Sequence, residues 1–97
     1  MEVSSVSVVI PTYNRGLVLE RTIVSYLKQG NVSEIIVVDD GSDAASREAV
    51  RRLEALPGVR CRRHSRRLGL PAARNTGIGA ARGEFVFFGE DDVWLGD

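Results

Sequence analysis

Four short runs of apolar residues divide the chain, and each has the composition of a β-strand. They are rich in valine, isoleucine and phenylalanine, which favour strands. Pro11 is expected to end the first run, because proline lacks the N–H that a sheet ladder needs. The third run alternates apolar and basic residues, which predicts a half-exposed strand at the sheet edge. The expected strands cover residues 5–10, 35–38, 59–64 and 85–88.

Three stretches between these runs carry apolar residues three or four positions apart, which is the period of an amphipathic helix. Ser42 or Asp43 can cap the second stretch, and Pro71 suits the first turn of the third. The expected helices cover residues 16–28, 43–56 and 71–82. The order βαβαβαβ predicts an α/β fold with a Rossmann-like parallel sheet. Continuous apolar runs in the first, second and fourth strands predict that helices cover both faces of that sheet.

Polar residues cluster where three of the strands end, and open α/β sheets bind ligands at this edge. The clusters are Pro11, Thr12, Tyr13, Asn14 and Arg15 after the first strand, Asp39 and Asp40 after the second, and Glu90, Asp91 and Asp92 after the fourth. Parallel strands end at the same edge, so five carboxylates are expected to share it and to need a neutralising cation or ligand. Oxygen ligands without nearby histidine or cysteine favour Mg²⁺ or Mn²⁺.

A divalent cation held by one or two carboxylates usually shares its coordination shell with substrate phosphates, so a nucleotide diphosphate is the expected partner. Tyr13 is expected to lie against the base, and Asp40 to accept a hydrogen bond from the base or the ribose. Arg74 is expected to pair with Asp40 or to contact a phosphate oxygen. His64 is interpreted as an edge residue beside the basic third strand. VDDGS alone is also an ordinary strand-to-turn sequence, and only the three clusters together favour a ligand site.

Length and charge narrow the function further. The chain has 97 residues, which is room for a single domain, 1–97. Its 13 basic and 13 acidic residues cancel, which argues against a general nucleic-acid binder. One cysteine, Cys61, excludes an internal disulfide, and no apolar run approaches the length of a membrane span. The expected location is the cytoplasm, including the membrane periphery.

Nucleotide-binding motifs of other classes are missing. Gly77, Gly79 and Gly83 resemble a dinucleotide fingerprint, but they lie late in a helix and before a strand, so packing and helix termination explain them better. The only lysine, Lys28, is followed by Gln29, so no phosphate-cradling GxxxxGK loop is present. A phosphoryl-accepting receiver domain would need an acidic pair after its first strand and a lysine late in the chain, and the sequence has neither.

Four ordered motifs carry a resemblance to a known family: VSVVIPTYNR at 6–15, EIIVVDDGSDA at 34–44, GLPAARNTGIGAARGEFVFF at 69–88 and EDDVW at 90–94. With them the chain resembles the amino-terminal, nucleotide-binding half of a family 2 glycosyltransferase of the GT-A fold. The resemblance implies transfer of a sugar from a nucleotide diphosphate sugar, commonly UDP-linked, to an acceptor hydroxyl. It also implies inversion at the anomeric carbon and a divalent metal, Mn²⁺ or Mg²⁺.

The strand-end clusters and the resemblance together yield a set of candidate site residues. The candidates for nucleotide binding are Pro11, Thr12, Tyr13, Asp40, Gly69, Arg74 and Asp91. In the region that matches the family's DxD motif, Asp92 is the first candidate metal ligand and Asp91 the second. The sequence departs from the family pattern at Gly89, where many members carry an acidic residue, and at Arg67, where asparagine is frequent.

The family's general base and acceptor site lie well beyond the acidic motif. The resemblance therefore implies that no catalytic base is among these 97 residues and that the chain stops before the acceptor half. The acceptor, whether saccharide, lipid or protein, stays open, as do the sugar and the linkage. The alternative from another functional class is a non-catalytic nucleotide-binding module.

Overall fold

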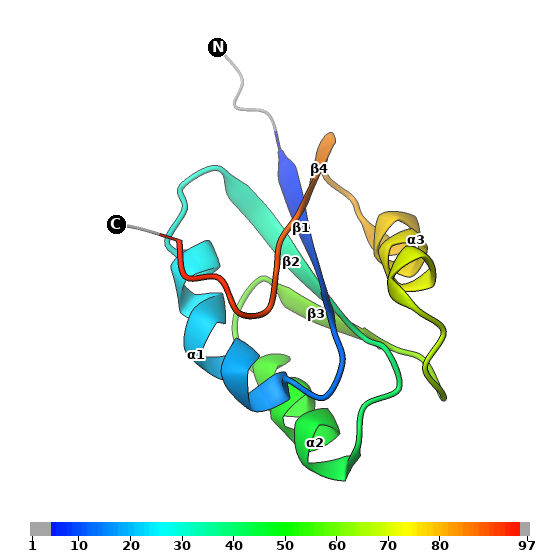
Figure 1. Cartoon of the computed structure of the whole chain (residues 1–97). Helices are drawn as coiled ribbons and strands as arrows, with labels where there is room; N and C mark the ends of the chain where they lie inside the picture. Colours follow the sequence, from blue (N-terminus) through cyan, green and yellow to red (C-terminus); the bar gives the residue numbers. More distant parts are fainter. Residues whose placement is uncertain (1–4, 96–97) are drawn as a thin grey trace.

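The computed structural model describes residues 5–95, which form a parallel sheet flanked by helices (Figure 1). Its elements in chain order are β1 (Val6–Thr12), α1 (Gly16–Leu27), β2 (Val32–Asp39), α2 (Ala44–Leu53), β3 (Val59–Arg63), α3 (Leu70–Ala80) and β4 (Phe85–Phe88). The strand order is β3-β2-β1-β4, and every pairing is parallel. The predicted α/β class and the βαβαβαβ order are confirmed, with β3 at one edge.

Strand β1 continues through Pro11, so the expectation that Pro11 ends this strand is wrong. β1 pairs with β4 only as far as Val9, which lies opposite Phe88. The carbonyl of Val9 accepts a 2.8 Å hydrogen bond from Gly89 N–H on that side. Pro11, two residues further along β1, faces the same side beyond the end of β4. The N–H that proline lacks would therefore have no strand to bond, and the ladder to β2 stays intact.

Other boundaries differ from the expected ones by a few residues. β2 begins at Val32 rather than 35 because its first residue already pairs with Val6 of β1. α2 ends at Leu53, three residues early, and α3 ends at Ala80 rather than near Gly83. At the end of α3, Ala81 turns extended (φ −68°, ψ 138°), which lets the chain enter β4.

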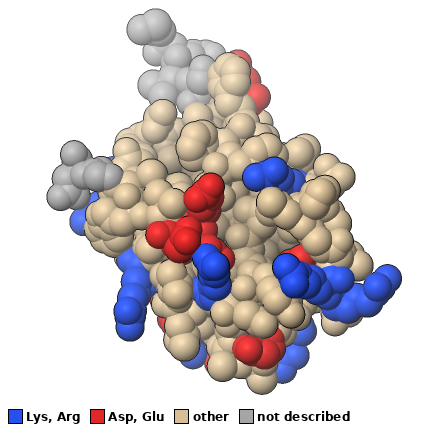
Figure 2. Space-filling view, in the orientation of Figure 1, with Lys and Arg blue, Asp and Glu red and all other residues tan. Residues whose placement is uncertain are grey.

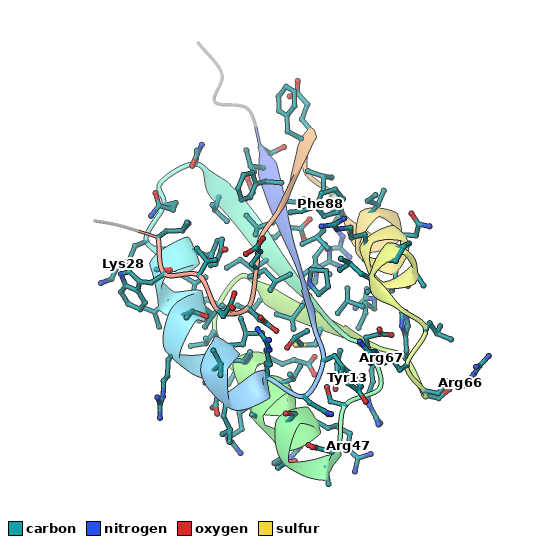
Figure 3. The ribbon with its side chains drawn as sticks, in the orientation of Figure 1. Tyr13, Lys28, Arg47, Arg66, Arg67 and Phe88 are labelled. Atoms are coloured by element: carbon teal, nitrogen blue, oxygen red, sulfur yellow. The ribbon has the colours of Figure 1, made fainter. Side chains whose placement is uncertain are left out.

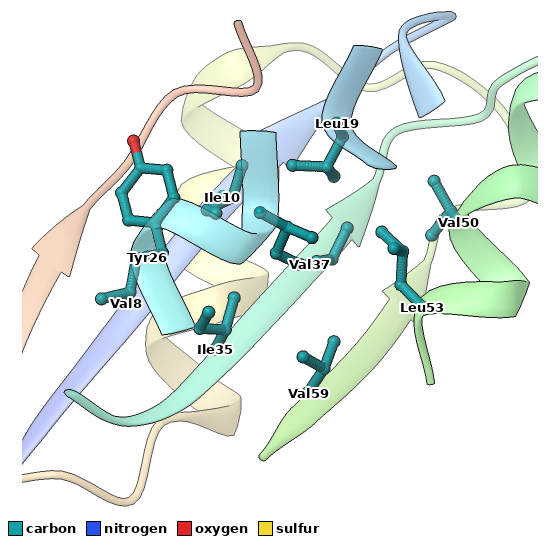
Figure 4. Close-up of a cluster of buried hydrophobic side chains, with 10 residues drawn as sticks. Val8, Ile10, Leu19, Tyr26, Ile35, Val37, Val50, Leu53 and Val59 are labelled. Atoms are coloured by element: carbon teal, nitrogen blue, oxygen red, sulfur yellow. The ribbon is translucent and has the colours of Figure 1, made fainter. Parts of the chain in front are cut away.

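Two hydrophobic clusters fill the spaces on the two faces of the sheet. α1 and α2 pack on one face, where they bury the cluster that Figure 4 shows. Its members are Val8, Ile10, Leu19, Ile23, Tyr26, Ile35, Val37, Val50, Leu53 and Val59. α3 packs on the other face against Val9, Ile36 and Val38 through Ala73. Coverage of β1 and β2 on both faces is thus confirmed.

Coverage of β4 on both faces is wrong for the described residues. Its four side chains are 38–54% exposed, although their sequence, FVFF, is apolar throughout. Among residues 5–95, β4 pairs only with β1 and forms the second edge of the sheet. A continuous apolar run cannot distinguish a buried strand from an edge strand whose side chains lie open. In the same part of the chain, no helix is long and apolar enough to span a membrane.

Gly77 allows α3 to lie close against the sheet. A Cβ atom at this position would collide with the Val9 side chain, which is fully buried in the central strand. Gly79, two residues further along the same helix, has no atom within 4 Å of the equivalent position. The interpretation of these glycines as packing residues is therefore confirmed for Gly77 but not for Gly79.

The two glycines provide a matched pair of substitutions. Gly77→Ala should lower the free energy of unfolding by about 1–3 kcal/mol, because the added methyl group overpacks a core that cannot yield. Gly79→Ala should leave stability unchanged or raise it by up to about 1 kcal/mol, because alanine favours the helix. Urea unfolding followed by circular dichroism measures both. Equal effects of the two substitutions would contradict the close packing of α3.

Glu34 joins four segments at the end of the sheet opposite the candidate site. Its carboxylate accepts hydrogen bonds from Ser7 Oγ (2.6 Å), from Arg60 Nε and Nη2 (3.1 and 2.6 Å) and from Arg82 N–H (2.7 Å). Arg60 also donates to the carbonyl of Ala80, so the same network holds the end of α3. Burial opposes ionisation of Glu34, but the bonds from Ser7, Arg82 and Arg60 outweigh it and keep its pKa below the usual value.

Glu34→Gln should destabilise the fold in a pH-dependent way. At pH 7 we expect a loss of about 1–3 kcal/mol, because hydrogen bonds to a charged, mostly buried group are lost. The pKa of Glu34 is lower in the folded than in the unfolded chain. Its contribution is therefore complete above the unfolded value of about 4.3 and is lost as the pH falls through the folded value.

Urea midpoints of the wild type and of Glu34→Gln at pH 7, 5 and 3.5 measure this dependence, with the exposed Glu84→Gln as the control. The difference between the wild type and Glu34→Gln should shrink at the lowest pH. A difference that stays constant from pH 7 to 3.5 would show that the charge of Glu34 does not stabilise the fold.

Candidate functional site

The candidate site lies where the order of the strands reverses. The chain builds β1, β2 and β3 in one direction across the sheet, and then returns past β1 to add β4 on the other side. The connections after β1 and β4 therefore diverge, which leaves a crevice at the carboxyl ends of these strands. Two adjoining hollows occupy this crevice, and Pro11 and Leu70 line both of them.

The first hollow, which we call the tyrosine hollow, has a volume of about 140 Å³. Its lining residues are Pro11, Thr12, Tyr13, Asp40, Arg67, Leu70 and Ala73. The Arg67 guanidinium lies 4.2 Å from the centre of the Tyr13 ring, and Figure 3 shows the two side chains together. An aromatic face at the end of β1 is thus available in the hollow, with a mobile cationic group stacked on it.

Asp40 organises the connection between β3 and α3. Its Oδ1 accepts hydrogen bonds from Leu68 N–H (2.9 Å) and from His64 Nδ1 (2.8 Å), and its Oδ2 accepts one from Gly69 N–H (2.9 Å). Gly69 has a φ of 102°, a left-handed conformation that suits glycine and turns the chain into α3. Burial opposes ionisation of Asp40, yet the bonds from Leu68, His64 and Gly69 keep its pKa below the usual value.

The structure corrects two expectations about this carboxylate. His64 follows the edge strand, but its side chain is only 9% exposed and lies between Asp40 and the Thr76 hydroxyl, which is 2.8 Å from Nε2. Because an ionised Asp40 can only accept, Nδ1 of His64 carries the hydrogen in this arrangement. Arg74 makes no ion pair with Asp40. Its guanidinium lies over the Phe88 ring instead, 5.2 Å from the ring centre, and Arg74 lines the second hollow.

The second hollow, the acidic hollow, has a volume of about 300 Å³. Its lining residues are Pro11, Arg15, Leu70, Arg74, Gly89, Glu90, Asp91 and Asp92. Asp91 accepts a 3.0 Å hydrogen bond from Thr12 Oγ1, and Arg15 Nη1 lies 3.1 Å from Asp92 Oδ2 and 3.6 Å from Asp91 Oδ1. Figure 2 shows acidic atoms with basic atoms directly beside them near the middle of this face.

Asp91 and Asp92 differ in their surroundings. The Asp91 side chain is 12% exposed, whereas that of Asp92 is 51% exposed. Burial raises the pKa of Asp91, and the neighbouring charge of Asp92 adds to it, despite the opposing effects of Thr12 and Arg15. Asp92 is therefore the more accessible carboxylate for a ligand, and Asp91 is the more constrained one.

Polar side chains of α1 hold the segment that carries these acids. Thr22 Oγ1 donates to the carbonyl of Asp91 (2.7 Å), and Tyr26 contacts both the N–H and the carbonyl of Glu90 (3.0 and 3.2 Å). Ser25 Oγ accepts from Leu95 N–H at 2.9 Å. These three positioning residues were missed in the sequence. Their signal was a set of hydroxyl groups on the otherwise apolar, buried face of a helix.

Gly89 explains why the acidic residue of the family pattern is displaced here. Its N–H donates to Val9, and a Cβ at this position would lie 2.9 Å from the Tyr26 ring. An acidic side chain would need Tyr26 to move, which would break the contacts that hold Glu90. The extra acid therefore stands one residue later, at the exposed Glu90.

The five carboxylates do not form one cluster. Asp39 and Asp40 alternate along β2 and point to opposite faces of the sheet, so Asp39 lines a separate pocket with residues of α2 and β3. Its Oδ1 accepts from Ser42 N–H, and Arg63 Nε lies 3.8 Å from Oδ2. Among residues 5–95, no three or more acidic, histidine or cysteine side chains form a group that could hold a metal.

A divalent cation still fits the acidic hollow. Asp91 and Asp92 offer hard oxygen donors on one wall, and Mg²⁺ and Mn²⁺ sites commonly use one or two carboxylates together with phosphate oxygens and water. The remaining ligands would then come from a bound diphosphate. The donor set therefore suits a metal that arrives with a ligand better than a metal held by protein alone.

Comparison with known proteins identifies the family. The profile described as "Glycosyl transferase family 2" matches residues 7–97. Chondroitin synthase of Escherichia coli is 37% identical over 87 residues, which are 87% of this chain and 13% of that protein. The chain thus spans less than a third of the length of the curated relatives it matches.

Solved structures agree with this assignment. The mannosyltransferase PcManGT from Pyrobaculum calidifontis, in complex with GDP-Man and Mn²⁺, has a TM-score of 0.85 at 29% identity, over 97% of this chain and 29% of that one. TarS 1-349 of S. aureus in complex with UDP-GlcNAc has a TM-score of 0.79 at 28% identity, over 93% and 27%. With the predicted GT-A, Rossmann-like architecture confirmed by these neighbours, the chain belongs to glycosyl transferase family 2.

Proposed function

We propose that the tyrosine hollow and the acidic hollow together bind a nucleotide diphosphate sugar, and that this chain forms the donor side of an inverting glycosyltransferase. The observation that carries the proposal is their adjacency. Pro11 and Leu70 line both hollows, so one elongated ligand can occupy them in sequence. The aromatic end suits a base, and the end with carboxylates and arginines suits a diphosphate with its cation.

In this arrangement the base lies against Tyr13, with Pro11 and Thr12 forming the adjacent wall. Of the four acceptor positions of the Asp40 carboxylate, three are used by Leu68, His64 and Gly69. The remaining position on Oδ2 can accept a hydrogen bond from a base N–H or a ribose hydroxyl. Asp40 thereby has two tasks: it shapes the turn at Gly69 and it offers a single acceptor to the nucleotide.

The diphosphate lies in the acidic hollow, where Arg74 is within reach of its oxygens and Asp91 faces the ribose or the metal. Asp92 is the principal metal ligand, because it is the more exposed of the two acids. A bound Mn²⁺ or Mg²⁺ would neutralise charge on the diphosphate as it leaves the sugar. UDP is the nucleotide we propose, in keeping with the UDP-GlcNAc in the TarS structure, whereas the GDP-Man of PcManGT makes GDP the comparison.

Nucleotide binding should be visible as a rise in melting temperature. UDP with Mn²⁺ at about ten times the Kd should stabilise the chain by roughly 1.4 kcal/mol, which corresponds to about 5–10 °C in a domain of this size. Thermal unfolding with UDP, GDP and dTDP, each with and without Mn²⁺, measures the shift. Asp92→Asn should remove the Mn²⁺-dependent part, while Glu84→Gln, at the far end of β4, should leave it unchanged. No shift with any nucleotide at millimolar concentration would refute the proposal for this chain.

We also propose that these 97 residues alone transfer no sugar. Inverting transfer needs a base that takes the proton of the acceptor hydroxyl while its oxygen attacks the anomeric carbon and the nucleotide diphosphate leaves. Asp39 faces the other side of the sheet, and Asp40 is committed to Leu68, His64 and Gly69. By resemblance to the family, the base and the acceptor wall belong to residues beyond Asp97.

The test is release of UDP from a panel of UDP-sugars with simple sugar acceptors, at high concentration of the chain. A longer family member serves as the positive control. We expect no detectable acceptor-dependent release, because general-base catalysis alone contributes about 10² to 10⁴ in rate and positioning of the acceptor contributes more. Acceptor-dependent release that Glu90→Gln abolishes would show that the base lies within this chain after all.

A further inference from the structure

Arg15 occupies the acidic hollow with a positive charge of the protein's own. It is the residue just before α1, and its Nη1 lies 3.1 Å from Asp92 Oδ2 and 3.6 Å from Asp91 Oδ1. Its side chain is 55% exposed, so the ion pairs rather than packing hold it in this position. A guanidinium cannot lose its proton in a protein, so this cation is present at every physiological pH.

The same carboxylate oxygens are those that a divalent cation would use. Metal–oxygen distances of about 2.0–2.2 Å require the ion to sit closer to the oxygens than Arg15 does. A metal ion and a guanidinium cannot both occupy that space, and their charges repel each other. Binding of the metal therefore requires Arg15 to leave Asp92. The displacement is inexpensive, because ion pairs between exposed side chains contribute little to stability.

A diphosphate in the acidic hollow would provide Arg15 with a new partner. Arg15 and Arg74 line this hollow, and arginine binds phosphate oxygens in the same bidentate manner as it binds carboxylates. Arg74 already lies against Phe88, which leaves Arg15 as the arginine whose present partners are the carboxylates themselves. Transfer of Arg15 from Asp92 to a phosphate would free the carboxylates at the moment the nucleotide arrives.

We infer that Arg15 is a resident counter-cation that couples the two ligands: it keeps the divalent metal out of the acidic hollow until a nucleoside diphosphate binds. This inference rests on the function proposed above. By thermodynamic reciprocity, the metal must then increase nucleotide affinity by the same factor as the nucleotide increases metal affinity. Arg15 acts here as a positioning residue for the charges of the site and takes no part in bond making.

The experiment measures Mn²⁺ affinity by electron paramagnetic resonance of free Mn²⁺ at low ionic strength, first without nucleotide and then with UDP or GDP. Arg15→Gln should bind Mn²⁺ about two- to fivefold tighter than the wild type without nucleotide, because the competing charge is gone. Arg15→Lys keeps the charge and should remain within about twofold of the wild type. Arg21→Gln removes an equal charge from an exposed position of α1 and should have no effect.

With nucleotide present, the gain in Mn²⁺ affinity should be larger for the wild type than for Arg15→Gln. Adding Asp92→Asn to Arg15→Gln should abolish the tighter binding, which ties it to this hollow. Circular dichroism checks that each variant is folded. Equal nucleotide-free Mn²⁺ affinities of the wild type and Arg15→Gln would overturn the role of Arg15 alone. No Mn²⁺ binding by either protein, even with UDP or GDP, would overturn both this role and the proposed metal site.

Discussion

Strand β1 hydrogen-bonds to β2 on one side and to β4 on the other, and the rest of the structure depends on this central position. Because β4 joins on the side opposite to β2, the connections after β1 and β4 leave the sheet in different directions. The crevice between them is where Tyr13, Arg15 and the acids at 90–92 meet. The early end of β4, opposite Val9, also makes room for Pro11 at the point where β1 enters the site.

Buried side-chain hydrogen bonds convert this crevice into a defined surface. Asp40 holds the Leu68–Gly69 turn from below, and the hydroxyl groups of Thr22, Ser25 and Tyr26 hold the acidic segment from α1. Both devices satisfy backbone groups of loops that have no ladder partner, which a mostly buried loop needs. The loops are thus positioned by elements distant in sequence rather than by their own propensity.

Charge in the site is arranged for exchange rather than for permanent pairing. Asp40 has internal partners that keep it ionised in place, whereas Asp92 is exposed and held only by Arg15. Arg67 on Tyr13 is likewise a cation on a surface that a ligand would use. In each case a ligand replaces an exposed protein contact of modest strength, so binding does not require the core to open.

The sequence by itself determined the order of elements, the parallel sheet and the family, because hydrophobic period and strand-end motifs are local properties that survive in any tertiary context. It also singled out the acids and the tyrosine at the strand ends. Only the tertiary structure decided which of them meet. His64 is buried against Asp40, Asp39 points to the opposite face, and Arg15 lies on Asp91 and Asp92. These outcomes depend on contacts between residues 24 to 77 positions apart, which no local pattern encodes. The exposure of β4 has the same origin, because an apolar run specifies a strand but its burial is specified by whatever packs beside it.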